Sequence, residues 1–191
     1  MTLSCTGILL AAGQGTRFGA NKLLHPLKDG TPMAVASARH LKAALPRSIA
    51  VVADADSELA GYLAQEGLHI IENPRAAEGM GTSIACGVAA SAEASGWVIA
   101  LADMPRIPVA IIQAVTAGLE EGADIVAPDY QGQRGHPVGF AARHGPVLLQ
   151  LRGDAGARSI IAANSGSLQL IDTSDAGVIF DIDSPASPRT L

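Results

Sequence analysis

The chain has 191 residues and a formal net charge of −5, with 48% hydrophobic and 3% aromatic residues. This length suits one domain of ordinary size, and the composition is globular and far from the polar profile of disorder. The acidic balance argues against a nucleic-acid-binding surface, and no apolar run reaches the 18 or so residues of a membrane-spanning helix.

Apolar runs alternate with helical patterns along most of the chain. We expect strands at residues 6–12, 48–53, 68–71, 97–101 and 124–127, because each is a short apolar run. The patterns between them predict helices at 31–45, 56–66, 82–94 and 108–121, several of which begin at proline or end before glycine.

The pattern changes in the last third of the chain. Residues 129–134 are typical of a hairpin tip, with 137–140 as its return strand, one or two helices at 146–164, and late strands at 168–171 and 178–182. Strand–helix alternation predicts an α/β protein with a mostly parallel sheet, helices on both faces and a late antiparallel hairpin. With no linker and no repeat, we expect residues 1–191 to form a single domain.

The first residues and the cysteines bear on localisation. Residues 1–5 place no basic segment ahead of an apolar stretch, so we expect no signal peptide. Cys5 and Cys86 form no C-x-x-C pair and are expected to be reduced and buried. These features predict a cytoplasmic protein.

The first expected loop is rich in glycine and carries two cations. It reads Ala12-Gly13-Gln14-Gly15-Thr16-Arg17-Phe18-Gly19, and Lys22 follows. Glycines after a first strand let backbone amides approach a phosphate, and Arg17 and Lys22 add positive charge. The dinucleotide pattern G-x-G-x-x-G fails at Phe18, and the P-loop pattern is absent. The alternative is a tight turn with solvated charges.

Two acidic residues follow expected strands. Asp103 ends an apolar run and precedes Met104-Pro105, so its carboxylate is expected at the ligand crevice of a parallel sheet. A carboxylate there suits Mg²⁺, although an Asp that caps the next turn is the alternative. Asp183 is a second candidate metal ligand and Asp181 its substitute; solvated tail charges are the alternative.

Two further segments are candidates for ligand contacts. Gly79-Met80-Gly81-Thr82-Ser83 places glycines before hydroxyl residues at a helix start, which indicates either a helix cap or contacts to a nucleobase or sugar. Arg134-Gly135-His136-Pro137 places one histidine in a loop, and no other His, Cys or Asp is spaced with it for a zinc site.

Together these segments resemble the small nucleotidyltransferases of molybdenum cofactor maturation, in order and spacing, from about residue 6 to residue 185. The matching segments are Leu10-Ala11-Ala12-Gly13-x-Gly15-x-Arg17-Phe18-Gly19, Lys22-Leu23, Gly79-Met80-Gly81-x-Ser83, Leu101-Ala102-Asp103-Met104-Pro105, Gly135-His136-Pro137-Val138, Leu151-Arg152-Gly153-Asp154-x-Gly156-Ala157-Arg158 and Asp181-Ile182-Asp183-Ser184-Pro185. Ala12 and the Gly-His-Pro segment favour the cytidylyl branch over the guanylyl branch, which typically has Leu-Ala-Gly-Gly and Gly-Gln-Pro.

The resemblance implies a Rossmann-like nucleotidyltransferase fold and a reaction between CTP and the molybdopterin-bound molybdenum cofactor. The products would be the cytosine dinucleotide cofactor and pyrophosphate, with Mg²⁺ as the metal. The implied protein partners are a molybdenum hydroxylase or its maturation chaperone, with no nucleic acid and no membrane. No general base is needed if the attacking group is an ionised phosphate, so positioning and charge stabilisation suffice.

The resemblance also implies a role for each matching residue. Arg17, Lys22 and Asp103 are the implied catalytic residues, and Asp103 and Asp183 the implied metal ligands. The implied nucleotide-binding residues are Leu10, Ala11, Ala12, Gly13, Gly15, Thr16, Arg17, Lys22, Gly79, Met80, Gly81, Ser83 and Asp103. Arg134, His136, Arg152 and Arg158 are candidates for the acceptor side.

Other functions stay open at this point. The chain could be a guanylyltransferase or a sugar or alditol nucleotidyltransferase of the same fold, or a non-catalytic carrier of the molybdenum cofactor. A carrier would bind the cofactor without CTP and release no pyrophosphate. The presence of Asp103 together with Asp183 favours catalysis.

Overall fold

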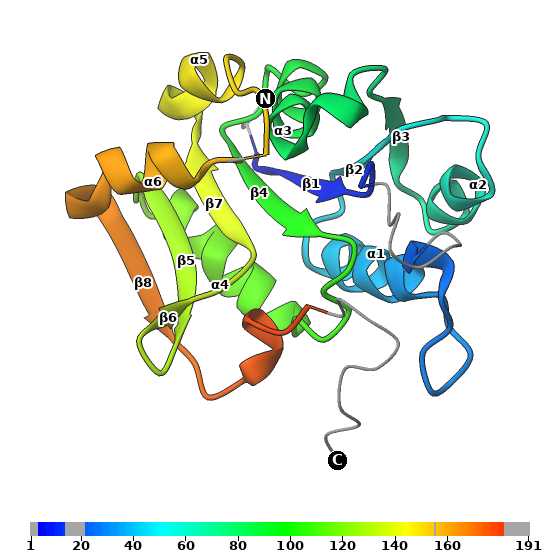
Figure 1. The fold of residues 1–191 in the computed structure, drawn as a ribbon. Coiled ribbons are helices and arrows are strands. Elements are labelled where there is room, and N and C mark those ends of the chain that lie inside the picture. Colours follow the sequence, from blue (N-terminus) through cyan, green and yellow to red (C-terminus); the bar gives the residue numbers. More distant parts are fainter. Residues whose placement is uncertain (1–3, 14–21, 155, 182–191) are drawn as a thin grey trace.

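The computed structural model describes residues 4–13, 22–154 and 156–181 (Figure 1). Eight strands of these residues form one sheet in the order β3-β2-β1-β4-β7-β5-β6, with β8 on the other side of β5 from β7. Their bounds are β1 Thr6–Leu10, β2 Ser48–Val52, β3 His69–Glu72, β4 Gly96–Leu101, β5 Ile125–Tyr130, β6 Gln133–Arg134, β7 Val138–Ala141 and β8 Leu168–Asp172.

Most neighbouring strands are parallel, as the alternating pattern predicts. β1 pairs in parallel with β2 and β4, β2 with β3, and β5 with β8. The expected hairpin is confirmed: β6 and β7 return antiparallel to β5, and β7 lies between β5 and β4. The α/β fold class with a late antiparallel element is therefore confirmed.

Helices cover both faces of the sheet. α1 (Met33–Ala44), α2 (Glu58–Gln65) and α4 (Val109–Glu120) pack on one face, and α3 (Met80–Ala89), α5 (Gly145–Leu148) and α6 (Arg158–Ala163) on the other (Figure 1). Short 3-10 turns lie at Lys22–Leu24, Ala76–Glu78, Ala142–His144, Ser165–Ser167 and Ala176–Val178. None of the described helices is long and apolar enough to cross a membrane.

The sheet divides the hydrophobic core into two layers, because successive side chains of a strand point to opposite faces. In β1, Leu9 belongs to the layer that also holds side chains of α1 and α4, whereas Ile8 and Leu10 belong to the layer that holds side chains of α3 and α6. All five residues of β1 are buried. A strand covered on both faces is mostly apolar, which explains the apolar run that follows Thr6 in the sequence.

Some expected elements differ from the structure. The strand expected at 178–182 is wrong: residues Ala176–Val178 form a 3-10 turn, and no described residue after it belongs to a strand. The side chain of Asp175 accepts the Gly177 N–H at 2.8 Å, and a Cβ on Gly177 would lie 2.4 Å from the Arg106 carbonyl oxygen. A turn packed this closely on another loop cannot extend as a strand. The helix expected at 82–94 spans Met80–Ala89. The expectation of one or two helices at 146–164 is confirmed by α5 and α6.

Candidate functional site

A cleft of about 780 Å³ opens at the edge of the sheet where β1 and β4 end. Leu10 and Leu101 are the last residues of these strands and are paired in register. After β1 the chain continues to Ala12 and Gly13, and after β4 it continues to Asp103. The two strand ends and these three residues all line the cleft. In open α/β sheets the ligand crevice lies at the carboxyl ends of the strands.

Asp103 and Lys22 form an ion pair in this cleft. The Lys22 Nζ lies 3.1 Å from the Asp103 Oδ2, and the two side chains are 11% and 29% exposed. Asp103 is placed by the turn after β4, in which the Ala102 N–H donates to the Leu10 carbonyl oxygen at 3.1 Å. The Ser37 hydroxyl from α1 donates to the Ala102 carbonyl oxygen at 3.0 Å. The carboxylate therefore comes from a turn fixed by two neighbouring elements.

Met80 to Ser83 form the first turn of α3 and Gly79 is its N-cap, so the helix begins two residues before the expected Thr82. Gly79 has a φ of 111°, and a Cβ on it would lie 2.4 Å from the Gly153 carbonyl carbon. A Cβ on Gly81 would lie 2.8 Å from the Arg152 backbone, and the Gly81 N–H donates to the Gly153 carbonyl oxygen. Both glycines therefore admit the close approach of residues 152–154.

A second set of lining residues, here called the second wall of the cleft, carries cationic and imidazole groups. Arg134 ends β6, His136 joins β6 to β7, and Arg158 begins α6. Burial lowers the pKa of His136 to about 4, helped by the charge of Arg134 and opposed by that of Asp103. Burial and the charge of Arg158 lower the pKa of the Arg134 guanidinium. His136 is therefore neutral at pH 7 while the arginines stay charged.

Two buried atoms of this wall have no hydrogen-bond partner among the described residues. They are Nη1 of Arg134 and Nδ1 of His136. A buried polar atom without a partner costs free energy unless a ligand or water satisfies it. This end of the cleft is therefore chemically suited to a polar or anionic ligand.

The structure brings most of the residues singled out in the sequence to this cleft. Those that line it are Leu10, Ala12, Gly13, Lys22, Gly79, Met80, Ser83, Asp103, Arg134, His136 and Arg158, together with Asp181. Gly15, Thr16, Arg17 and Asp183 lie outside the described residues.

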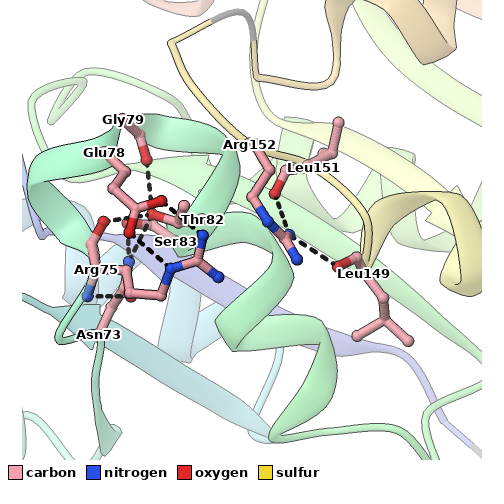
Figure 2. Close-up of polar contacts among 9 residues, drawn as sticks. All are labelled: Asn73, Arg75, Glu78, Gly79, Thr82, Ser83, Leu149, Leu151 and Arg152. Carbon is pink, nitrogen blue, oxygen red and sulfur yellow. Dashed lines mark hydrogen bonds and ion pairs between the residues drawn. The ribbon is translucent and has the colours of Figure 1, made fainter.

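Three of the expected residues lie elsewhere. Ala11 is buried on the face of the sheet that α1 and α2 cover, and Gly81 packs on the Arg152 backbone. Arg152 does not line the cleft, and its Nη1 donates to the carbonyl oxygens of Leu149 and Leu151 (Figure 2).

Sequence analysis missed two buried polar residues behind the cleft. Asn73 is 3% exposed and donates to the hydroxyls of Thr82 and Ser83, both at 3.0 Å. The Asn-Pro pair after β3 could have flagged a turn. Ser37 lies 65 residues before the carbonyl that it contacts, so no local pattern could have flagged it.

The acidic side chains of the cleft suit a hard cation. Asp103 and Asp181 both line it, and carboxylates are the ligands that Mg²⁺ prefers. No group of three or more His, Cys, Asp or Glu residues in the described chain could hold a metal by itself. One or two carboxylates suffice where the substrate's phosphates supply the other oxygen ligands.

Comparison with known proteins gives the family. Residues 7–169 match the MobA-like NTP transferase domain. The chain is 31% identical to the purine catabolism protein PucB of Bacillus subtilis (strain 168), over 94% of this chain and 91% of that protein. It is 29% identical to the nicotine blue oxidoreductase of Paenarthrobacter nicotinovorans (93% and 91% covered). It is 28% identical to the molybdenum cofactor cytidylyltransferase of Escherichia coli (strain K12), with 93% and 90% covered.

Solved structures agree on the fold. Rv0371c from Mycobacterium tuberculosis H37Rv superimposes with a TM-score of 0.82 at 24% identity, covering 96% of this chain and 95% of that one. Its manganese complex gives a TM-score of 0.77 at 24% identity, with 95% and 94% covered. With its cleft at the carboxyl ends of β1 and β4 and the match over residues 7–169, the chain belongs to the family of the MobA-like NTP transferase domain and is a nucleotidyltransferase of that family.

Proposed function

We propose that the protein transfers CMP from CTP to the phosphate of the molybdopterin-bound molybdenum cofactor and releases pyrophosphate. The observation that carries this proposal is the Asp103–Lys22 pair, which lines one cleft with Ala12 and Gly13 of the first loop. A relative named as a cytidylyltransferase aligns with 93% of the chain, and Ala12 agrees with the cytidylyl pattern.

The proposed reaction is an in-line displacement in which the chain positions the reactants. Lys22 binds the triphosphate as a point charge, and Arg17, outside the described residues, adds a second cation. The acceptor phosphate attacks the α-phosphorus of CTP, the bond to the β-phosphate oxygen breaks, and pyrophosphate leaves. An ionised phosphate needs no general base, so the chain contributes positioning and charge stabilisation.

We propose Asp103 as the ligand of a divalent metal ion, taken to be Mg²⁺, with Asp183 as the second carboxylate. Such an ion, when bound, would neutralise charge on the triphosphate and on the leaving pyrophosphate. Asp181 lines the cleft and is the described alternative to Asp183. The manganese complex of Rv0371c supports a divalent ion in this fold.

We assign the acceptor to the wall that carries Arg134, His136 and Arg158. The two guanidinium groups suit the acceptor's phosphate, since arginine binds phosphate oxygens bidentately. The neutral imidazole of His136 offers a hydrogen bond without adding charge. Arg152 is left out of this assignment because its Nη1 is bonded to backbone carbonyls outside the cleft.

The test is pyrophosphate release with each of the four NTPs, with and without purified molybdenum cofactor. We expect release only with the cofactor present, and a kcat/KM for CTP at least about tenfold above that for GTP, which requires only about 1.4 kcal/mol of differential transition-state binding. Introducing Ala12→Gly is expected to weaken this preference.

Other outcomes would replace the proposal. Equal turnover of GTP would show that the proposed preference for cytosine is wrong. Turnover with a sugar or alditol phosphate in place of the cofactor would show that the proposed acceptor is wrong. Tight cofactor binding without CTP and without pyrophosphate release would indicate a carrier. Each outcome is read from the same purified protein.

A further inference from the structure

Asn73 lies behind the cleft and is held in one orientation. It follows β3 directly, its backbone N–H donates to the Val52 carbonyl oxygen at 2.8 Å, and its side chain is 3% exposed. Its Oδ1 accepts the backbone N–H of Arg75 at 3.0 Å. A backbone N–H can only donate, so the amide oxygen must face Arg75 and the amide nitrogen must face α3.

The amide nitrogen of Asn73 fixes two hydroxyl groups at the start of α3 (Figure 2). It has two hydrogens, and Thr82 Oγ1 and Ser83 Oγ each lie 3.0 Å from it. Thr82 Oγ1 has carbonyl acceptors for its own hydrogen, those of Arg75 and Gly79, both at 2.9 Å. Both hydrogen-bonding roles of the Thr82 hydroxyl are therefore filled inside the protein.

The hydroxyl of Ser83 differs from that of Thr82. Ser83 is 4% exposed, lines the cleft, and accepts from Asn73, but its hydrogen has no acceptor among the described residues. Asn73 can only donate toward it, so the lone pair of Ser83 faces Asn73 and the hydrogen is directed elsewhere. The cleft is where an acceptor for that hydrogen can enter.

We propose that Asn73 is a positioning residue that fixes Ser83 as a hydrogen-bond donor toward an acceptor atom of the bound nucleotide. The inference rests on the proposed function, because it assumes that a nucleotide occupies the cleft. Cytosine offers acceptors of the required kind at its O2 carbonyl and its N3 ring nitrogen. In this arrangement the Ser83 hydroxyl donates to an acceptor atom of the ligand, and Asn73 sets the direction of that hydroxyl.

Asn73→Asp is the sharpest substitution, because it keeps the shape and the acceptor for the Arg75 N–H but replaces the donor by a second acceptor. The Ser83 hydrogen would then turn toward residue 73, and the cleft would lose its donor. We expect the Kd for CTP to rise at least about tenfold, from the loss of one hydrogen bond and from the added negative charge beside an anionic ligand. The KM for CTP should rise in parallel while kcat stays within about twofold.

A double-mutant cycle separates this role from a general structural one. Ser83→Ala alone is expected to weaken CTP binding about tenfold, and adding it to Asn73→Asp should cause no further loss, because both remove the same donor. Thr82→Val disturbs the same buried network and is the matched control: we expect a lower melting temperature but CTP affinity within about twofold of wild type.

The binding measurements are made by calorimetry on the full chain, with melting temperatures for every variant. Additive losses near a hundredfold in the double variant, or wild-type affinity in Asn73→Asp, would overturn the proposal. If Asn73→Asp fails to fold, Asn73→Ala decides in its place: it must weaken CTP binding, its loss must not add to that of Ser83→Ala, and wild-type affinity in Asn73→Ala would overturn the proposal. If the wild type binds none of the four NTPs, both the proposed function and this inference fail. If the wild type binds CTP and the substitutions at Asn73 and Ser83 leave its affinity unchanged, only the inference fails.

Discussion

Replacement of Asp103 by Asn tests the charge at the centre of the cleft. The substitution preserves side-chain size and removes one negative charge, which lies 3.1 Å from the Lys22 Nζ. Two unit charges at this distance interact by about 5 kcal/mol at an effective dielectric constant of about 20. A thousandfold loss of turnover requires about 4 kcal/mol, so one carboxylate facing a cation can supply it. We therefore expect the kcat/KM of Asp103→Asn for CTP to fall by about a thousandfold.

A binding measurement gives this prediction a second, independent readout. The described lining of the cleft carries three cationic side chains, Lys22, Arg134 and Arg158, and three acidic ones, Asp103, Asp154 and Asp181. Without divalent metal, the Asp103 charge opposes an anionic nucleotide. In EDTA we expect Asp103→Asn to bind CTP about threefold to tenfold more tightly than wild type, whereas with Mg²⁺ it should bind less tightly.

The assays are steady-state pyrophosphate release, and calorimetry of CTP binding in EDTA and in Mg²⁺. Asp172→Asn is the matched control, because Asp172 is an exposed residue at the end of parallel strand β8 and does not line the cleft. It should leave both readouts within about twofold of wild type. Turnover by Asp103→Asn within tenfold of wild type, or weaker CTP binding in EDTA as well as in Mg²⁺, would refute the reasoning.

Three further predictions concern stability and the placement of the site. Gly81→Ala should destabilise the fold by about 2–4 kcal/mol in urea unfolding, because its Cβ would lie 2.8 Å from the Arg152 backbone. The control Gly61→Ala, in α2 with open space around it, should stabilise the fold by about 0.5–1 kcal/mol. Equal effects of the two substitutions would contradict the close packing of Gly81. Because the pKa of His136 is lowered to about 4, the unfolded chain binds a proton between about pH 6.5 and 4 that the native state does not bind. The free energy of unfolding should therefore decrease by up to about 3 kcal/mol as the pH is lowered through that window. His136→Gln should lack this decrease, and the same pH dependence in that variant would count against the prediction. Ser37→Ala should slow turnover about threefold to tenfold, because the Ala102 carbonyl that precedes Asp103 loses its bond; full activity would show that the turn holds without it.

The fold could be predicted from the sequence wherever local patterns decide it. The segments that form β1 and β4 are buried on both faces of the sheet, so each is recognisable in the sequence as a short run of mainly apolar residues. The strand expected at 178–182 was wrong because the decisive contact, Gly177 against Arg106, joins residues 71 positions apart. An apolar run alone does not distinguish a strand from a 3-10 turn held by such a contact.

The candidate site was predictable to the same extent. Asp103 could be placed in a crevice because strand ends in parallel sheets have a known position. Gly79 and Gly81 could be singled out, but not the reason for them, since their close neighbours are residues 152–154. The pairing of Lys22 with Asp103 spans 81 positions and has no local signal.

The two sides of the cleft differ in how directly the sequence specifies them. The charges of Lys22 and Asp103 lie in the cleft themselves, so a pattern of residue types is enough to find them. On the side of α3, the cleft sees only the hydroxyl of Ser83, and its direction is set by a buried amide that does not line the cleft. If Asn73 positions Ser83 as proposed, a substitution at Asn73 changes what the cleft binds while every lining residue stays the same. Under this proposal, the residues that line the cleft do not by themselves reveal what it binds, because Asn73 does not line it.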